Sequence, residues 1–371
     1  MKITKLETFF VKPRWVFLKM HTDEGLVGWG EVTLEGWSHT VAAAVQEIAR
    51  YLIGQDPRRI EHHWQAVYRG GFYRGGPVLL SALSGIEQAM WDITGKWLGA
   101  PVHQLMGGAV RERIRLYCHV GGEDTEAGVR LAREGVARGF TAVKAALFGA
   151  VRFTEPRAFV AEVAGRMAAL RQAVGDGVEI GVDFHGRVGP AMAVQLALAI
   201  EPYHPMFIEE PCLPENVDAL ARVARATHVP IATGERLFTK WAFREVLEKG
   251  AAAILQPDLS HAGGILEVRK IAAMAECYFV PLAPHCPLGP IALAACLQLD
   301  ACIPNFLCQE QVNLGEGYLR RPFAVEQGSV AVPTGPGLGI EVDEEAVRGK
   351  LYAGDWETPR LYHEDGSVAD W

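Results

Sequence analysis

Carboxylates and histidines recur at regular intervals along the last two thirds of the chain, each at the end of a short apolar run. They are Asp183, Glu209, Glu235, Asp258, His285 and Glu310. Successive members are 26, 26, 23, 27 and 25 residues apart, about the length of one strand plus one helix. The side chains differ while the spacing persists, which indicates a repeated structural position rather than a repeated sequence.

Asp183, Glu209 and Glu235 are the candidate ligands of a hard divalent cation. Three clustered carboxylates cannot all stay ionised without a strong positive partner. Mg²⁺ accepts a few carboxylates and keeps positions for substrate oxygens, and Mn²⁺ would also fit. The alternative is local pairing of each carboxylate with an arginine such as Arg187. Glu210 follows Glu209, and adjacent strand residues point to opposite faces, so only one of the two should reach the metal. Glu209 fits the period.

Two histidines are candidates for proton transfer. His285 is the candidate general base, because Asp258 at a neighbouring strand end could orient its ring and raise its basicity. His185 lies two residues after Asp183, so the two side chains should share a strand face, across the site from His285. Glu310 completes the set: as a neutral acid it could donate a hydrogen bond to an oxyanion, whereas as an anion it would repel one. A lone histidine is more often structural, but the regular array favours catalysis here.

The elements that must position these residues alternate from residue 113 onward. The predicted strands are 114–119, 142–148, 178–185, 206–210, 230–235, 252–258, 280–285 and 305–310. The predicted helices between them are 125–138, 156–174, 190–200, 215–227, 239–249, 264–276 and 288–300. Eight strands separated by seven helices predict a parallel α/β barrel, in which all strand C-termini open on one face. The polar residues should therefore converge there.

The first third of the chain predicts a small α+β domain. Its strands are expected at 1–11, 15–21 and 27–31, followed by helices at 38–53, 57–69 and 77–98. A glycine-rich segment at 70–76 is either a flexible connector or a substrate lid. Candidate substrate-binding residues are Tyr73, Arg74, Trp29 and Trp37, each also compatible with an ordinary structural role. Lys144 is a further candidate, with an ion pair to the ligand carboxylates favoured over Schiff-base chemistry.

Composition excludes several classes of protein. The 371 residues include 36 basic and 44 acidic side chains, for a net charge of −8, which argues against nucleic-acid binding. No apolar run reaches the roughly 18 residues that a membrane span needs, and we expect no membrane association. The seven cysteines contain no C-x-x-C pair, which favours reduced thiols in a cytoplasmic protein over a disulfide or zinc framework.

With these residues in place, the chain resembles the mandelate racemase subgroup of the enolase superfamily, and within it the galactonate dehydratase branch. The segments that carry the resemblance are 1–4, 68–77, 181–187, 207–211, 256–264, 283–290 and 366–371. The strand-end carboxylates are shared across the superfamily. The Asp-Phe-His segment at 183–185 and the Ala-Pro-His-Cys-Pro-Leu-Gly-Pro segment at 283–290 are more specific to the branch.

The resemblance implies an α/β fold: a (β/α)7β TIM-like barrel with an α+β capping domain. Residues 1–112 would form the capping domain, 113–325 the barrel, and 326–371 a C-terminal segment that returns to the cap. It also implies one Mg²⁺ per subunit, with Mn²⁺ as a substitute, a small-molecule sugar acid as substrate, and a homo-oligomer.

The resemblance further implies dehydration of D-galactonate or a related aldonate. The sugar acid would chelate Mg²⁺ through its carboxylate and 2-hydroxyl, and His285, assisted by Asp258, would remove the C2 proton. Mg²⁺ and Glu310 would hold the enediolate, a use of Mg²⁺ with a Lys or His base that is general in the superfamily. His185 would protonate the departing 3-hydroxyl, and the enol would tautomerise to a 2-keto-3-deoxy sugar acid.

Two departures from the branch pattern leave alternatives open. Ala146 stands two residues after Lys144, where galactonate dehydratases typically carry asparagine and racemases a second lysine. After Gln311 the segment is short and lacks the usual His-Tyr pair. A dehydratase for gluconate or a pentonate is therefore an alternative, as is a C2 racemase or epimerase of a 2-hydroxy acid. A non-catalytic metal-binding barrel is the alternative from a different class.

Overall fold

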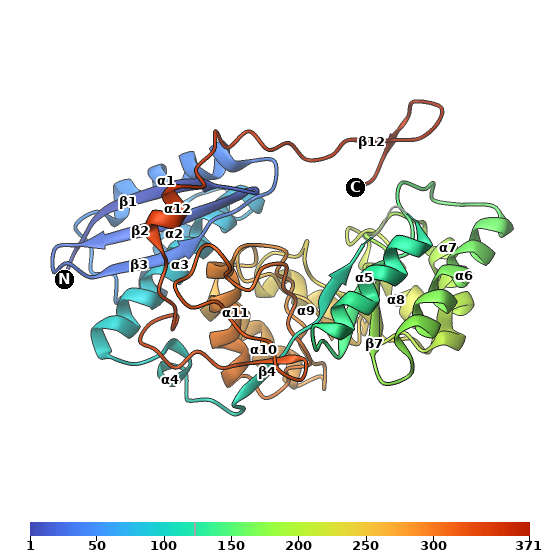
Figure 1. Cartoon of the computed structure of the whole chain (residues 1–371). Coiled ribbons are helices and arrows are strands. Elements are labelled where there is room, and N and C mark those ends of the chain that lie inside the picture. Colours follow the sequence, from blue (N-terminus) through green and yellow to red (C-terminus); the bar gives the residue numbers. More distant parts are fainter. Residues whose placement is uncertain (122–123) are drawn as a thin grey trace.

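The computed structural model describes residues 1–121 and 124–371, and its N-terminal part is a small sheet covered by helices (Figure 1). The antiparallel strands β1 (Ile3–Val11), β2 (Trp15–Thr22) and β3 (Val27–Glu31) pair in chain order. They are followed by helices α1 (Ser38–Leu52), α2 (Ile60–Gly70), α3 (Pro77–Leu98) and the short α4 (Val102–Leu105). The predicted α+β capping domain is confirmed.

Strand β2 is buried on both faces, and this explains how the sheet joins two cores. Val16, Leu18 and Met20 pack into the cluster beneath α1 and α3. Trp15 and Phe17 point the other way and belong to the large cluster that also contains the barrel helices. Because successive strand residues alternate in direction, one strand contributes to both clusters and fixes the cap against the barrel.

The second part of the chain alternates strands and helices, as predicted. Parallel strands β5 to β10 form one six-stranded sheet in chain order. The strands are β4 (Arg113–Arg115), β5 (Cys118–Val120), β6 (Ala142–Ala146), β7 (Glu179–Asp183), β8 (Phe207–Glu209), β9 (Ile231–Thr233) and β10 (Ile254–Leu255). The helices are α5 (Thr125–Ala137), α6 (Arg157–Val174), α7 (Pro190–Ile200), α8 (Val217–Ala224), α9 (Thr239–Glu248), α10 (Ile265–Glu276) and α11 (Pro290–Cys302), with a 3₁₀ turn η1 (Glu201–Tyr203).

Single parallel bridges close this sheet into a barrel. Leu255 pairs with Leu282, Leu282 with Phe306, and Leu116 with Gln309. The last two predicted strands, 280–285 and 305–310, are therefore present only as bridges rather than as ladders. Prolines at 281 and 284 explain this for the first of them, because a proline cannot donate to a ladder. The resulting (β/α)7β barrel confirms the predicted fold class.

A layer of apolar side chains fills the barrel below its polar mouth. The members of this layer are Tyr117, Ala142, Phe207, Ala232, Ile254, Ala283 and Cys308. Gly181 belongs to the same level of β7, where an added Cβ would lie 2.6 Å from the Phe207 ring. The interior is thus packed, as in other α/β barrels, and a substrate can approach only from the mouth.

Two buried glutamates from the cap bind the N-termini of barrel helices. Glu31 accepts hydrogen bonds from the backbone N–H groups of Gly289 (2.7 Å) and Ala292 (3.1 Å) at the start of α11. Glu87 accepts two from Ile265 and Leu266 at the start of α10, both 2.9 Å. Burial is the largest influence on both carboxyls and raises the pKa of each to about 7, although the N–H donors oppose that rise.

The C-terminal segment returns to the cap and then leaves it again. Strand β11 (Ser329–Ala331) pairs with β4, and helix α12 (Glu344–Arg348) lies beside the capping sheet (Figure 1). Leu351 forms a bridge to Val11 of β1. A small hairpin of β12 (Leu361–Tyr362) and β13 (Val368–Ala369) then reaches toward the barrel side. The division of the chain at 112 and 325 stays a prediction.

Among the residues that the structure describes, none of the helices combines the length and the apolar character needed to cross a membrane.

Candidate active site at the barrel mouth

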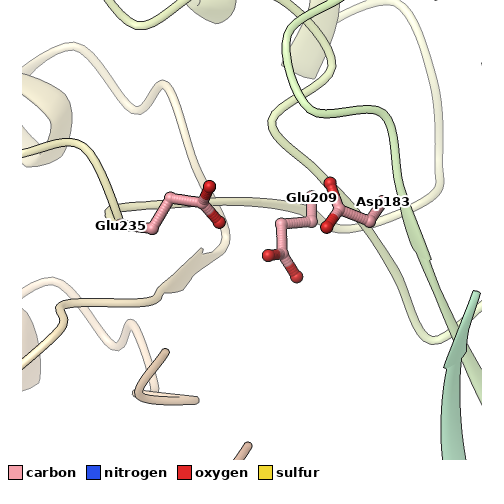
Figure 2. Close-up of side chains that lie close together, drawn as sticks. All are labelled: Asp183, Glu209 and Glu235. Carbon is pink, nitrogen blue, oxygen red and sulfur yellow. The ribbon is translucent and has the colours of Figure 1, made fainter. Parts of the chain in front are cut away.

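Three carboxylates from consecutive strand ends meet at the mouth of the barrel. Asp183 ends β7, Glu209 ends β8, and Glu235 follows β9 by two residues. One oxygen from each lies within 4.8 Å of the others. Figure 2 shows Glu235 entering from the side opposite Asp183, with the Glu209 carboxylate between them. An all-oxygen set of this size suits a hard divalent cation such as Mg²⁺.

The electrostatics of the three carboxylates differ because their neighbours differ. Burial together with the nearby carboxylates of Glu210 and Glu209 raises the pKa of Glu235 well above its usual value. Burial also acts against the charge of Asp183, but Lys144 and His185 outweigh it and lower the pKa of that carboxyl. Glu235 is therefore the carboxylate that would gain most from a bound cation, because it has no lysine or arginine within ion-pairing distance among the described residues.

Lys144 is buried among the carboxylates rather than free for covalent chemistry. Its Nζ lies 2.6 Å from Glu209 Oε1, 2.9 Å from Glu310 Oε1 and 3.4 Å from Asp183 Oδ2. Burial disfavours the ammonium, yet Glu209 and Glu310 raise its pKa well above its usual value. The predicted ion pair with the ligand carboxylates is present. Gln256 adds a hydrogen bond of 2.7 Å to the other oxygen of Glu209, a contact that the strand-end pattern did not indicate.

Glu210 is the neighbouring carboxylate that misses the cluster. Its side chain pairs instead with Arg236, whose Nη2 lies 2.6 Å from Oε2. Pairing with a nearby arginine was the alternative to metal binding for the clustered carboxylates. Glu210 makes such a pair, whereas Glu209 lies in the cluster.

His285 and Asp258 form a hydrogen-bonded pair at adjacent strand ends. His285 Nδ1 lies 2.8 Å from Asp258 Oδ2, so this nitrogen carries a hydrogen and Nε2 faces the mouth. Nε2 lies 3.6 Å from Glu235 Oε2 and 3.7 Å from Glu310 Oε2. Burial lowers the basicity of the imidazole, but Glu310 and Asp258 outweigh it and raise its pKa to about 9. The pair has the geometry of an oriented base.

His185 approaches the cluster from the other side. Its Nε2 lies 3.3 Å from Asp183 Oδ2, and Arg187 Nη2 lies 3.2 Å from its Nδ1. A guanidinium can only donate, so Nδ1 accepts and the hydrogen of the neutral ring lies on Nε2, toward the mouth. Burial, opposed by Asp183, lowers the pKa of His185.

The proximity of His185 to Asp183 has a different cause from the predicted one. Strand β7 ends at Asp183, and His185 has a φ of 52° in the turn that follows. The expectation that both side chains share one strand face is therefore wrong. A histidine in the left-handed region is uncommon, and such residues concentrate at functional sites. The backbone N–H of His185 donates to Asp183 Oδ1 at 2.8 Å and fixes the turn.

Glu310 differs from the expectation that it acts as a neutral donor. It accepts from the Cys286 backbone N–H at 2.7 Å and from Lys144, and His119 Nε2 makes a very short contact with it. Burial opposes its charge, but Lys144 and His285 hold its pKa well below the usual value. Glu310 is thus an ionised carboxylate that positions Lys144 and His119. Sequence reasoning missed His119, although it ends the first predicted barrel strand and so belongs to the same array.

Four predicted substrate-binding residues are either packed in the core or exposed to solvent. Trp29 is buried, with its ring 5.9 Å from that of Phe9 and 5.5 Å from the Lys19 ammonium, so the expectation that it binds substrate is wrong. Trp37 and Tyr73 are exposed. Arg74 is exposed as well. Within residues 1–121 and 124–371, none of the last three forms a hydrogen bond or ion pair with the carboxylates.

The barrel, its cap and the strand-end carboxylates define a class of metal-assisted enzymes. Residues 127–346 match the family model described as enolase C-terminal domain-like. Residues 7–107 match the N-terminal domain model of mandelate racemase and muconate lactonizing enzyme. The chain belongs to this mandelate racemase and muconate lactonizing enzyme family of the enolase superfamily.

Individual relatives make the placement narrower. The chain is 53% identical to a D-galactonate dehydratase from Ralstonia nicotianae and 51% identical to one from Cronobacter sakazakii, in each case over all of both chains. Among solved structures, an enolase from Agrobacterium radiobacter with bound Na and L-malate has a TM-score of 0.94 at 32% identity. A mandelate racemase/muconate lactonizing enzyme-like protein from Roseovarius has a TM-score of 0.92 at 37% identity. Both comparisons cover all of this chain and of the other.

Proposed function

We propose that the protein dehydrates a sugar acid, D-galactonate or a related aldonate, to a 2-keto-3-deoxy sugar acid with Mg²⁺ held by Asp183, Glu209 and Glu235. One observation carries this proposal: two histidines flank the carboxylate cluster from opposite sides. His285 Nε2 lies 3.6 Å from Glu235, and His185 Nε2 lies 3.3 Å from Asp183. A base on one side and a proton donor on the other are what removal of a C2 proton and of a 3-hydroxyl require.

The residues of this chain divide the reaction between them. His285, once it has lost its own proton, accepts the C2 proton on Nε2, while Asp258 keeps the hydrogen on Nδ1 and holds the ring. The C3–O bond then breaks, and His185, doubly protonated at this step, supplies the Nε2 proton with which the hydroxyl leaves as water, so that its own ring returns to the neutral form. The electron pair of the C2–H bond becomes the C2–C3 double bond. The enol tautomerises to the 2-keto-3-deoxy acid, so atoms and charges balance.

The donor set fits the cation that this chemistry needs. Three carboxylate oxygens within 4.8 Å of one another form a site for a hard ion, and burial together with the neighbouring carboxylates raises the pKa of Glu235 well above its usual value. Mg²⁺ would stabilise, as a Lewis acid, the negative charge that develops on the substrate carboxylate. Mn²⁺ is the expected substitute. Lys144 and His119, both held by Glu310, add fixed donors at the same mouth.

The names of the relatives support galactonate as the first substrate to test. Ala146 supports a related aldonate as the second candidate, because it registers with Asp183 across strands β6 and β7 and places only a methyl group beside the cluster. The alignment with the Ralstonia relative spans 385 positions against 371 residues here, so that relative contains residues that this chain lacks.

The direct test is a library of aldonic acids assayed with Mg²⁺ for 2-keto-3-deoxy products. We expect turnover of D-galactonate, D-gluconate or a pentonate, and no product from any of them would overturn the proposal. Racemisation would instead place solvent deuterium at C2 of recovered substrate without loss of water. A His285→Asn variant separates an enzyme from a binding barrel, because the enzyme should lose turnover while metal and ligand still bind.

We further propose that the enzyme works in the cytoplasm as a homo-oligomer. All seven cysteines are free, which supports a reducing compartment. The oligomer rests on the family resemblance. Sedimentation of the purified protein gives the subunit number, and a purely monomeric protein would overturn that part.

A further inference from the structure

The segment after α12 connects the cap with the barrel mouth (Figure 1). Near the cap, the hydroxyl of Thr358 lies 3.4 Å from the carbonyl of Glu35. Near the barrel, Asp365 forms a 2.7 Å ion pair with Arg152, which follows β6. The hairpin whose turn contains Asp365 has only two residue pairs, and a hairpin of that size is not stable alone. Contacts at both ends must therefore determine where the segment lies.

Trp371 at the end of this segment lies beside the proton donor of the site. Its ring centroid is 6.3 Å from that of His185, at an interplanar angle of 73°. The ring centroid of Trp356 lies 6.5 Å from that of Trp371. The side chain of Trp371 is 38% exposed, so part of the indole is free for another contact.

The row continues from Trp356 toward the base. The Arg14 guanidinium lies 5.1 Å from the centroid of the Trp356 ring. Arg14 Nη2 lies 3.4 Å from the carbonyl oxygen of Pro287, two residues after His285. The indoles and the arginine thus run from the donor histidine to the loop of the base histidine. We refer to this row of Trp371, Trp356 and Arg14, which come from the cap and the C-terminal segment, as the wall.

We propose that Trp371 is a specificity-determining residue whose indole packs against the carbon chain of the sugar acid beyond C3. The inference rests on the proposed dehydration. The substrate carboxylate and C2 belong at the three ligand carboxylates, and the 3-hydroxyl belongs at His185. The remaining carbons would then continue past His185, the residue whose ring lies beside the Trp371 indole. An aromatic face suits the C–H groups of a sugar chain, as aromatic side chains combine a large apolar surface with little conformational entropy.

The experiment compares Trp371→Ala, Trp371→Phe and a control on the same hairpin, Tyr362→Ala, whose side chain is 57% exposed. Each variant is assayed with Mg²⁺ on aldonates of three to six carbons. For Trp371→Ala we expect the KM of the six-carbon acid to rise about tenfold, the size of one lost apolar contact, with kcat changed less. The three-carbon acid should be unaffected, Trp371→Phe should retain most of the affinity, and Tyr362→Ala should match the unsubstituted enzyme.

Two outcomes would overturn the inference. Trp371→Ala could leave the KM of the six-carbon acid unchanged. It could instead reduce kcat equally for every chain length, which would indicate that Trp371 only holds the C-terminal segment in place. A binding measurement keeps the inference separate from the proposed reaction. D-gluconate added with Mg²⁺ should quench tryptophan fluorescence more in the unsubstituted protein than in Trp371→Phe. A larger quench in the unsubstituted protein, without turnover of any aldonate, would support the contact with Trp371 and reject the dehydration. An equal quench in the two proteins would reject the contact with Trp371.

Discussion

The molecule buries carboxylates in two regions, and their surroundings differ in kind. At the cap–barrel interface, Glu31 and Glu87 each face a pair of backbone N–H groups at the start of a barrel helix. At the mouth, Asp183, Glu209 and Glu235 face one another. The interface groups are satisfied by partial charges that folding supplies, because a helix N-terminus favours an anion. At the mouth, Asp183 and Glu209 share Lys144, whereas Glu235 has no lysine or arginine within ion-pairing distance among the described residues, so the cluster keeps unbalanced negative charge.

Burial alone does not identify a functional carboxyl in this molecule. The pKa values of Glu31, Glu87 and Glu235 are all raised. Burial is the largest cause in each case, but three nearby carboxylates raise the pKa of Glu235 further. A carboxyl whose pKa is raised by burial beside fixed N–H donors serves stability. A carboxyl whose pKa is also raised by several neighbouring carboxylates is a candidate for binding a cation.

The largest expected effect is on Mg²⁺ binding and turnover, and it is tested by replacing one glutamate of each region with glutamine. Glu235→Gln should weaken Mg²⁺ binding about a hundredfold or more and reduce turnover about 10³-fold, because a ligand to the Lewis acid is lost. The matched control, Glu87→Gln, should bind Mg²⁺ normally. Titration calorimetry and product assays measure both. In EDTA at pH 8, Glu235→Gln should unfold at a higher temperature than the unsubstituted protein, since repulsion is relieved; lower stability would show that the mouth carboxylates are not in conflict.

A second effect separates the regions by stability. Glu87→Ala leaves the N–H groups of Ile265 and Leu266, as well as the Trp91 indole N–H, without their acceptor. Buried donors without partners and a cavity should lower the free energy of unfolding by about 3 kcal/mol. Urea unfolding of the Mg²⁺-bound protein measures it. A loss below about 0.5 kcal/mol, the range of ordinary surface changes, would mean that the helix cap contributes little.

The pH dependence of stability provides a third test. The pKa of Glu87 is raised to about 7 in the folded protein, and the ordinary glutamate value is about 4.3. Between these values the folded state holds more protons than the unfolded state, so stability contributed by Glu87 falls as the pH rises from about 4.5 to 7. Glu87→Gln cannot take up this proton, and its stability should fall less over that window, by roughly 3 kcal/mol. Parallel curves for the two proteins would contradict the raised pKa.

The sequence was sufficient for the barrel and for much of the site because the strand-end residues recur with one period. That period predicted which groups meet at the mouth, namely the three clustered carboxylates, His285 and Asp258. It could not reveal charge states, because the pKa of Glu310 depends on Lys144 and His119, which come from other strands. Nor could strand alternation describe His185, which lies in a turn.

Contacts made by distant parts of the chain were also beyond the sequence. Trp29 has the residue type of a pocket wall, yet β3 directs it into the core. Trp371 lies beside His185 only because the C-terminal segment crosses from the cap to the barrel. Neither position follows from local periodicity, since both depend on how the two parts of the molecule pack.

The smallest expected effect concerns Ala146, which is in register with Asp183 of the mouth cluster. Ala146 is exposed at the end of β6, opposite Asp183 in the strand register. Ala146→Asn would introduce the amide that the galactonate dehydratase branch carries and would offer a hydrogen bond to one substrate hydroxyl. We expect the ratio of kcat/KM for D-galactonate to that for a pentonate to rise about three- to tenfold, the value of one added hydrogen bond. Stability should change by less than about 0.5 kcal/mol, because the position is exposed. Since the Ala146→Asn substitution adds no charge, Mg²⁺ affinity should stay the same. A change in Mg²⁺ affinity without a change in the substrate ratio would show that the asparagine acts on the carboxylate cluster and not on the sugar.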